Sequence, residues 1–325
     1  MSKLLSNAEV ISQSKTVFGQ FGESVWIPNA KKNVALKHHD ANKLISCGIG
    51  KVLVLVGMGP SLEEQVQSII KYRDRCDVCV CDKGFGPLLD HGVKADYVFL
   101  CDANIPYRHI EPYIDKTDGV KLIATPYAQT DWTTNWRGER YFFVMRDAIE
   151  SEQHFYAIFG PVRGVPAGSN VSNGMLSFFA GCDETNDKNW AGYERYLLIG
   201  YDYAWPLKGN YYAWSNPVEK RHYMTHRTIL DMNMNTYFTS ENLYFSAKWM
   251  MSYLSKFKIP VVNCSKRGLL MVVQQSTLEK ELSRLRPKEV TSKMVRQSFE
   301  ALRQLSGALE ESKRSFNLAR EAIWA

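Results

Sequence analysis

Short apolar runs recur along the first 270 residues and alternate with stretches of helical spacing. The clearest unit begins with the β-branched run KVLVLV (51–56) and continues into the turn GMGPS (57–61). Apolar residues between 62 and 70 then recur at helical spacing, and Ser61 and Glu64 match a capping box. This pattern predicts a strand, a tight turn and a helix.

Similar apolar runs predict further strands along the chain. They lie at 76–82, 95–102, 120–126, 141–147, 194–202 and 258–265. Strands that alternate with helical stretches indicate an α/β fold with a doubly wound, mainly parallel, Rossmann-like sheet. Such sheets bind ligands at the carboxyl ends of their strands.

The remaining segments carry weaker patterns. Residues 1–45 are polar and mixed, and predict one short helix and an exposed His38–His39 pair. Residues 203–240 have the composition of an aromatic loop, and 237–257 have the spacing of an amphipathic helix.

The C-terminal residues change character and predict an α-helical extension. Two apolar stripes flank Pro287, formed by Leu278, Leu282 and Leu285 before it and by Val295, Phe299, Leu302 and Leu309 after it. Such helices either pack onto the core or associate with a second copy, giving a homo-oligomer. We therefore divide the chain into an N-terminal segment (1–45), a nucleotide-binding α/β domain (46–275) and a helical tail (276–325).

Composition excludes several classes of protein. The 325 residues are 45% hydrophobic, and the net charge of +6 is spread too thinly to indicate a nucleic-acid partner. No apolar run is long enough to span a membrane, and the N-terminus lacks the apolar core of a signal peptide. Seven cysteines, an odd number, fit reduced thiols. We therefore expect a cytoplasmic protein.

Cysteines 76, 79 and 81 have a spacing that resembles part of a zinc site. No second pair of ligands with zinc-like spacing accompanies them. The pattern favours thiols buried in a strand.

The turn at 57–61 is the first candidate binding element. Gly57 and Gly59 permit a close approach of backbone to a ligand, and Pro60 and Ser61 lead into the helix, whose first N–H groups attract phosphate. The turn matches neither a P-loop nor GxGxxG. It either cradles a nucleotide or merely connects two elements.

Carboxylates follow two of the predicted strands. Asp82 and Asp102, with Asn104 close behind, would bind Mg²⁺ or a ribose hydroxyl, or would cap turns. A second small-residue turn, Gly168–Ser169–Asn170, precedes an apolar helix. It would contact a base or phosphate, or serve as an ordinary N-cap.

Residues 200–227 form the densest polar-aromatic cluster. His226 is a candidate general acid or base because the unperturbed pKa of histidine suits that role, although a single histidine is more often a plain surface or core residue. Trp205 and Trp214 would stack on a sugar or base, or anchor the loop.

These motifs resemble a known superfamily. GMGPSL (57–62), CDKGFGPLLDHGVKADYVFLCD (81–102), and GSNVSNGM followed by LLIGYDYAW resemble the MptE-like superfamily in order. It includes archaeal 6-hydroxymethylpterin diphosphokinases and bacterial motility accessory factors. The resemblance covers roughly residues 50–270.

The same order is similar to a bacterial sialyltransferase family that uses a CMP-sugar donor. That resemblance implies that Tyr203 and Tyr212 hold the donor phosphate and that His226, within HYMTH (222–226), is the catalytic base. Asp82 and Asp102 replace asparagines of that family, and Asn170 replaces a glycine. Because extra carboxylates beside a donor phosphate suggest a bound Mg²⁺ or a different nucleotide, a metal-dependent diphosphokinase remains the alternative.

The resemblances thus imply a transferase with a nucleotide donor. The first hypothesis is a glycosyltransferase that uses a CMP-nonulosonate-like donor and a small-molecule or glycan acceptor. The alternative is an ATP-dependent diphosphokinase, with Mg²⁺ on Asp82 and Asp102. A third possibility is a nucleotide-binding module without catalysis.

Overall fold

The structure is a computed structural model and describes most of the chain. The described residues are 20–146, 149–160, 162–166, 170–181, 189–215, 226–231 and 233–287. The side chains of 149–152 and His226 are not among them. The predictions for Gly168, Ser169, His222 and the second stripe of the tail lie outside the described residues.

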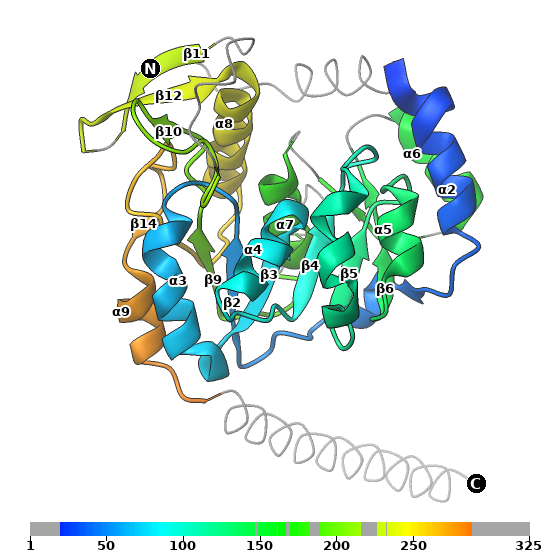
Figure 1. Ribbon diagram of the computed structural model, residues 1–325, viewed down its shortest axis with the longest axis horizontal. Helices are drawn as coiled ribbons and strands as arrows, with labels where there is room; N and C mark the ends of the chain where they lie inside the picture. Colours follow the sequence, from blue (N-terminus) through cyan, green and yellow to red (C-terminus); the bar gives the residue numbers. More distant parts are fainter. Residues whose placement is uncertain are drawn as a thin grey trace, which may run out of the picture.

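A parallel sheet forms the centre of the described structure (Figure 1). Its nine strands are ordered β1-β6-β5-β4-β3-β2-β9-β13-β14, and every neighbouring pair is parallel. Their bounds are β1 His39–Asp40, β2 Val52–Val56, β3 Asp77–Cys81, β4 Tyr97–Leu100, β5 Lys121–Ala124, β6 Arg140–Phe142, β9 Arg195–Ile199, β13 Val261–Asn263 and β14 Gln274–Gln275. The predicted doubly wound sheet is confirmed.

The strand order reverses beside β2. From β2 the chain adds β3, β4, β5 and β6 on one side, then returns to place β9 and β13 on the other. The switch point of the sheet therefore lies between β2 and β9. Ligands of open α/β sheets bind outside the carboxyl ends of the strands at such a point.

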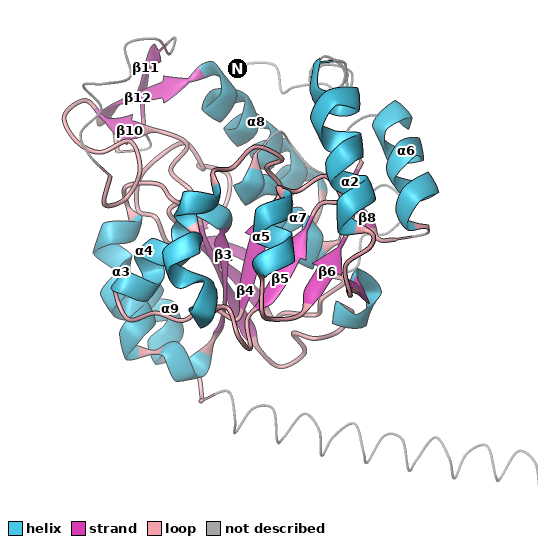
Figure 2. Cartoon of the chain, turned by 45° about the vertical axis from the view of Figure 1, so that its right-hand side comes forward, coloured by secondary structure: helices cyan, strands magenta, loops and turns pink. Residues whose placement is uncertain are grey.

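Helices cover both faces of the sheet (Figure 2). Apolar residues of α3, α4, α5 and α9 pack on one face, and those of α7 and α8 pack on the other. The helices are α2 Ile27–Asn33, α3 Leu62–Lys71, α4 Phe85–Asp90, α5 Thr130–Asn135, α6 Ile149–Phe159, α7 Val171–Ala180, α8 Glu241–Lys256 and α9 Leu278–Ser283. Shorter helical turns are η1 Gly22–Trp26, η2 Ala41–Leu44, η3 Arg73–Arg75, η4 Asp82–Gly84, η5 Tyr107–His109 and η6 Glu111–Lys116.

Burial on two faces explains the continuous apolar runs of the strands. In β2, Leu53 and Leu55 belong to the core beneath α7 and α8, while Val52, Val54 and Val56 belong to the core beneath α3 and α4. When both faces of a strand are covered, every position is buried, so apolar residues do not alternate with polar ones.

The described parts of the segment 203–240 contain strands that its composition does not predict. A second sheet of three antiparallel strands, ordered β10-β12-β11, contains β10 Trp205–Pro206, β11 His226–Leu230 and β12 Thr236–Ser240. The prediction of a helix from 237 was wrong for its first four residues. The Ser240 side chain instead accepts a hydrogen bond from the N–H of Leu243 and starts α8 at Glu241.

The run at 141–147 does not form one strand. β6 ends at Phe142 in the main sheet, and β7 (Val144–Met145) pairs with β8 (Gly164–Val165) in a separate two-stranded sheet.

Both ends of the described chain pack onto the domain. Leu278 and Leu282 of the first stripe lie in α9 and are fully buried in the core shared with α3, and Leu285 follows the helix and packs against the same core. At the other end, the predicted short helix is α2. The expectation of an exposed His38–His39 pair was wrong, because both residues are partly buried and the His38 ring lies 5.3 Å from that of Phe142.

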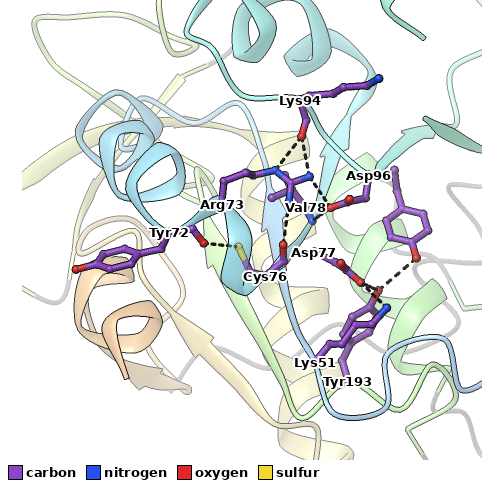
Figure 3. A network of polar contacts seen from close by, with 10 residues as sticks. Lys51, Tyr72, Arg73, Cys76, Asp77, Val78, Lys94, Asp96 and Tyr193 are labelled. Atoms are coloured by element: carbon purple, nitrogen blue, oxygen red, sulfur yellow. Dashed lines mark hydrogen bonds and ion pairs between the residues drawn. The ribbon is translucent and has the colours of Figure 1, made fainter. Parts of the chain in front are cut away.

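A polar network ties the amino ends of the strands together (Figure 3). The Asp96 carboxylate accepts hydrogen bonds from the Arg73 guanidinium and from the N–H of Val78, each at 2.7 Å. The buried Asp77 accepts from Lys51 at 3.3 Å and from the Tyr193 hydroxyl at 3.0 Å. The hydrogen-bonding groups of this network are thus bound to one another. A cavity lies at the opposite edge of the sheet.

Candidate functional site

A cavity of about 660 Å³ opens at the carboxyl ends of the strands. Its volume is in the range of roughly 300–1,000 Å³ that is typical of small-ligand sites. It is lined by Phe21, Trp26, Met58, Gly59, Cys81, Asp82, Lys83, Cys101, Asp102, Ala103, Asn104, Tyr127, Met145, Asn170, Val171, Ser172, Gly200, Tyr201, Tyr203, Ala204, Tyr211, Tyr212, Asn242 and Leu243. Residues from the turns after β2, β3, β4, β5 and β9 thus share one site.

The glycine turn after β2 is packed against the turn after β9. The N–H of Gly57 donates to Ile199, and that of Gly59 donates to the carbonyl of Gly200, each at 2.9 Å. A Cβ on Gly57 would lie 2.5 Å from the Gly200 oxygen. Gly57 must therefore lack a side chain to pack against protein backbone. Within the predicted turn, only Gly59 and Met58 line the cavity.

Ser61 and Asp202 lock the two turns together. The Ser61 hydroxyl donates to Asp202 Oδ1 at 2.5 Å, and its N–H donates to Oδ2 at 2.7 Å. The predicted capping box was wrong, because the Ser61 side chain makes no cap bond to α3. Burial raises the pKa of Asp202 to about 6, although its hydrogen bonds with Ser61 oppose that rise. Sequence reasoning missed Asp202, even though it follows β9 much as Asp82 and Asp102 follow their strands.

Asp202 makes the stability of the fold depend on pH. Its pKa is raised from 3.8 to about 6 on folding, so the folded state holds an extra proton between those values. Its contribution to stability is full below about pH 4 and is lost as pH rises through about 6. In Asp202→Asn, the difference in unfolding free energy between pH 4.5 and pH 7.5 is expected to change by on the order of 2 kcal/mol, because this pH-dependent contribution is lost. Urea titrations at pH 4.5 and 7.5 measure the change.

The exposed Asp118 provides the control for this experiment. Asp118→Asn should keep the native pH dependence. A pH dependence of Asp202→Asn equal to that of the native protein would contradict the assignment.

Asp82, Asp102 and Asn104 come together on the cavity wall. Asp82 is buried and accepts a hydrogen bond from the N–H of Lys83 at 2.7 Å. Burial raises the pKa of Asp82 to about 6, and the charge of Asp102 adds to the rise. Asp102 is exposed and accepts from the N–H of Asn104 at 2.8 Å, so it does cap a turn. Turn capping leaves further carboxylate oxygens able to meet a ligand.

These two carboxylates have the chemistry of a magnesium site. Mg²⁺ is commonly held by one or two carboxylates, with phosphate oxygens and water as its other ligands. Asp82 and Asp102 fit that donor set. Across the described part of the chain, no group of three or more His, Cys, Asp or Glu side chains is arranged to hold a metal. Cys76, Cys79 and Cys81 are buried, as the strand pattern predicts.

The N-terminus of α7 borders the same cavity. Asn170 is its N-cap and accepts a hydrogen bond from the N–H of Ser172 at 2.7 Å. Asn170, Val171 and Ser172 all line the cavity. The positive end of the helix dipole favours a negatively charged ligand group here.

The two predicted tyrosines differ in burial. The buried Tyr203 donates its hydroxyl proton to Asn173 Oδ1 at 2.6 Å, and burial raises its pKa well above the usual value. Tyr212 is half-buried on the cavity wall. Trp205 is buried beside Tyr211. Trp214 stacks on His91, with ring centroids 4.1 Å apart. Neither tryptophan lines the cavity. Both tryptophans therefore anchor the loop.

His226 is placed by its backbone. It is the first residue of β11 and pairs with Ser240, which caps α8. Two residues of the first turn of α8, Asn242 and Leu243, line the cavity. The strand position of His226 is therefore next to an element that borders the site.

The N-terminal segment supplies an apolar wall that sequence reasoning missed. Trp26 lines the cavity and stacks on Tyr127 with ring centroids 4.3 Å apart. Asn29 donates to the carbonyl of Tyr127 at 3.0 Å, and Asn33 donates to those of Pro126 and Ala128. Two asparagines four residues apart thus clamp α2 to the turn after β5.

Among the described segments, no helix is both long enough and apolar enough to span a bilayer.

A solved structure shares the fold. It is the MAf glycosyltransferase from Magnetospirillum magneticum AMB-1, with a TM-score of 0.55 and 16% sequence identity over 85% of this chain. The match covers 42% of that protein, so the present chain corresponds to less than half of its length. A search of curated proteins returned no match.

The sequence model of the family described as 6-hydroxymethylpterin diphosphokinase MptE-like matches residues 24–206. This range contains the glycine turn, both strand-end carboxylates and the start of α7. The chain belongs to the MptE-like family.

Proposed function

We propose that this protein is a nucleotide-dependent transferase and, most specifically, a glycosyltransferase with a CMP-nonulosonate-like donor. One observation carries the proposal. The cavity lies at the switch point of a doubly wound sheet and joins Gly59, the α7 N-terminus and Tyr212. The positive end of the α7 dipole and a phenol suit a nucleotide phosphate.

In this mechanism His226 removes the proton from the acceptor hydroxyl. Tyr212 stabilises the charge on the departing phosphate, because its hydroxyl is a donor without a formal charge. Tyr203 holds Asn173 within α7, and its hydroxyl would have to leave Asn173 to donate to a phosphate. The assignment of His226 rests on the HYMTH resemblance, with support from its position opposite Ser240.

The acceptor would enter along the apolar wall. Phe21, Trp26 and Tyr127 carry no charge and line the cavity beside Ala103 and Met145. Uncharged aromatic surfaces suit the apolar face of a sugar ring. This division leaves the charged and phosphate-binding groups to the donor.

The second candidate is an ATP-dependent diphosphokinase. It is favoured by the presence of Asp82 and Asp102 on one cavity wall. These carboxylates would hold Mg²⁺, which neutralises charge on the phosphates during transfer. In this case the aromatic wall would face the flat ring of the acceptor.

A nucleotide panel, read as the shift in unfolding temperature with and without Mg²⁺, separates the candidates. A ligand at about 100 times its Kd is expected to stabilise the protein by about 2.7 kcal/mol. Stabilisation by CMP without metal supports the glycosyltransferase. Stabilisation by ATP that requires Mg²⁺ supports the diphosphokinase. Binding without consumption of any donor supports the non-catalytic module, and no response to either nucleotide contradicts the proposal.

A further inference from the structure

Lys83 is the one cationic side chain among the described residues that line the cavity. It follows Asp82 in η4, the helical turn directly after β3, at the carboxyl edge of the sheet. The other charged residues of the lining are Asp82 and Asp102. The charges on the described wall are therefore two carboxylates and a single ammonium group.

The Lys83 ammonium makes no ion pair within the described part of the protein, although its charge opposes the rise in the pKa of Asp82. No described carboxylate lies within ion-pair distance of its Nζ, and Asp82 is bound by the backbone N–H of Lys83 instead. Other lysines differ in this respect. Lys51 pairs with Asp77 at 3.3 Å, and Lys71 pairs with Glu279 at 2.8 Å. Lys83 therefore keeps its positive charge available to a ligand.

The position of Lys83 relative to Tyr212 indicates which part of a ligand it would meet. The Nζ atom lies 5.7 Å from the centre of the Tyr212 ring. A cation at this distance from an aromatic face is held there by the ring quadrupole. An ammonium beside a phenol offers several hydrogen-bond donors to one phosphate group. Of these two donor groups, only the ammonium carries charge.

The two carboxylates oppose the binding of an anionic ligand, and a nearby cation offsets them. A phosphate that enters beside Asp82 and Asp102 meets repulsion, which is strong at a partly buried site because the dielectric is low. A lysine in the same wall offsets it as a compact point charge. The geometry points to Lys83 as the residue that binds the nucleotide's phosphate, next to Tyr212. This inference rests on the proposed nucleotide-dependent function and applies to either donor.

The test compares nucleotides with their uncharged nucleosides. Binding of CMP and cytidine, and of ATP and adenosine, is measured by calorimetry for the native protein and for Lys83→Met. The variant is expected to weaken binding of the nucleotide that the native protein binds by roughly 10- to 100-fold, the range for a hydrogen bond to a charged group. Binding of the matching nucleoside should stay unchanged, because it has no phosphate.

Two further variants complete the design. Lys83→Arg keeps the charge and should retain most of the affinity for the nucleotide. Lys94→Met removes an exposed lysine at the amino edge of the sheet, where its Nζ donates to the Asp118 carbonyl, and should bind as the native protein does. Native affinity in Lys83→Met, or equal losses for nucleotide and nucleoside, would overturn the inference while the proposed function stands. Failure of the native protein to bind either nucleotide would overturn both.

Discussion

Gly200→Ala is expected to destabilise the protein by more than about 3 kcal/mol. A Cβ at this position would lie 2.3 Å from the carbonyl oxygen of Gly57, and the residue has a φ of +65°. The substitution therefore adds a backbone clash to the conformational cost of a left-handed residue. It also separates the turns after β2 and β9, which form the switch point. Urea unfolding followed by circular dichroism measures the loss.

Gly92→Ala isolates the conformational part of that effect. Gly92 has a φ of +81°, but a Cβ there would meet no atom within 4 Å. This variant should lose only about 1 kcal/mol. Similar losses in the two variants would show that the contact between the turns contributes nothing to stability.

His226→Ala is expected to reduce turnover by about 10²- to 10⁴-fold, the usual contribution of a general base. Affinity for the nucleotide should change little, because the base acts on the acceptor. Steady-state rates with saturating donor, together with the nucleotide Kd, separate the two effects. In the native enzyme the rate should fall on the acid side as the base becomes protonated.

His222→Ala is the matched control, since both histidines belong to the HYMTH string. Its loss of rate should be far smaller. Equal losses in the two variants would reject the choice of His226 as the base. Full activity of His226→Ala would remove the sialyltransferase-like mechanism and favour chemistry at Asp82 and Asp102.

The strands and the edge of the sheet that carries the cavity could be predicted from the sequence because the signal is local. A strand buried on both faces, such as β2, must be an unbroken apolar run. The residues that follow such a strand must then lie at the carboxyl edge, which placed Gly59, Asp82 and Asp102 at one site. The same logic would have identified Asp202 after β9, had it been applied to every strand end.

Local patterns were misleading where a side chain found a distant partner. Ser61 has the spacing of a helix cap, but the Asp202 carboxylate lies 141 positions away along the chain and takes its hydroxyl proton. Residues 237–240 continue the apolar spacing of α8, but pairing with β11 makes them a strand. In both cases long-range hydrogen bonding outweighs a weak local preference.

The apolar wall of the site was decided by tertiary structure alone. Trp26 belongs to a polar segment with no motif, and it reaches the cavity because Asn29 and Asn33 bind carbonyl groups near Tyr127. Those carbonyls are about a hundred residues further along the chain. The sequence by itself determined the sheet, its carboxyl edge and the strand-end carboxylates, since burial and strand direction follow from local order. Only the folded chain decided which side chains meet across that edge, because hydrogen bonds between distant segments leave no periodic trace in the sequence.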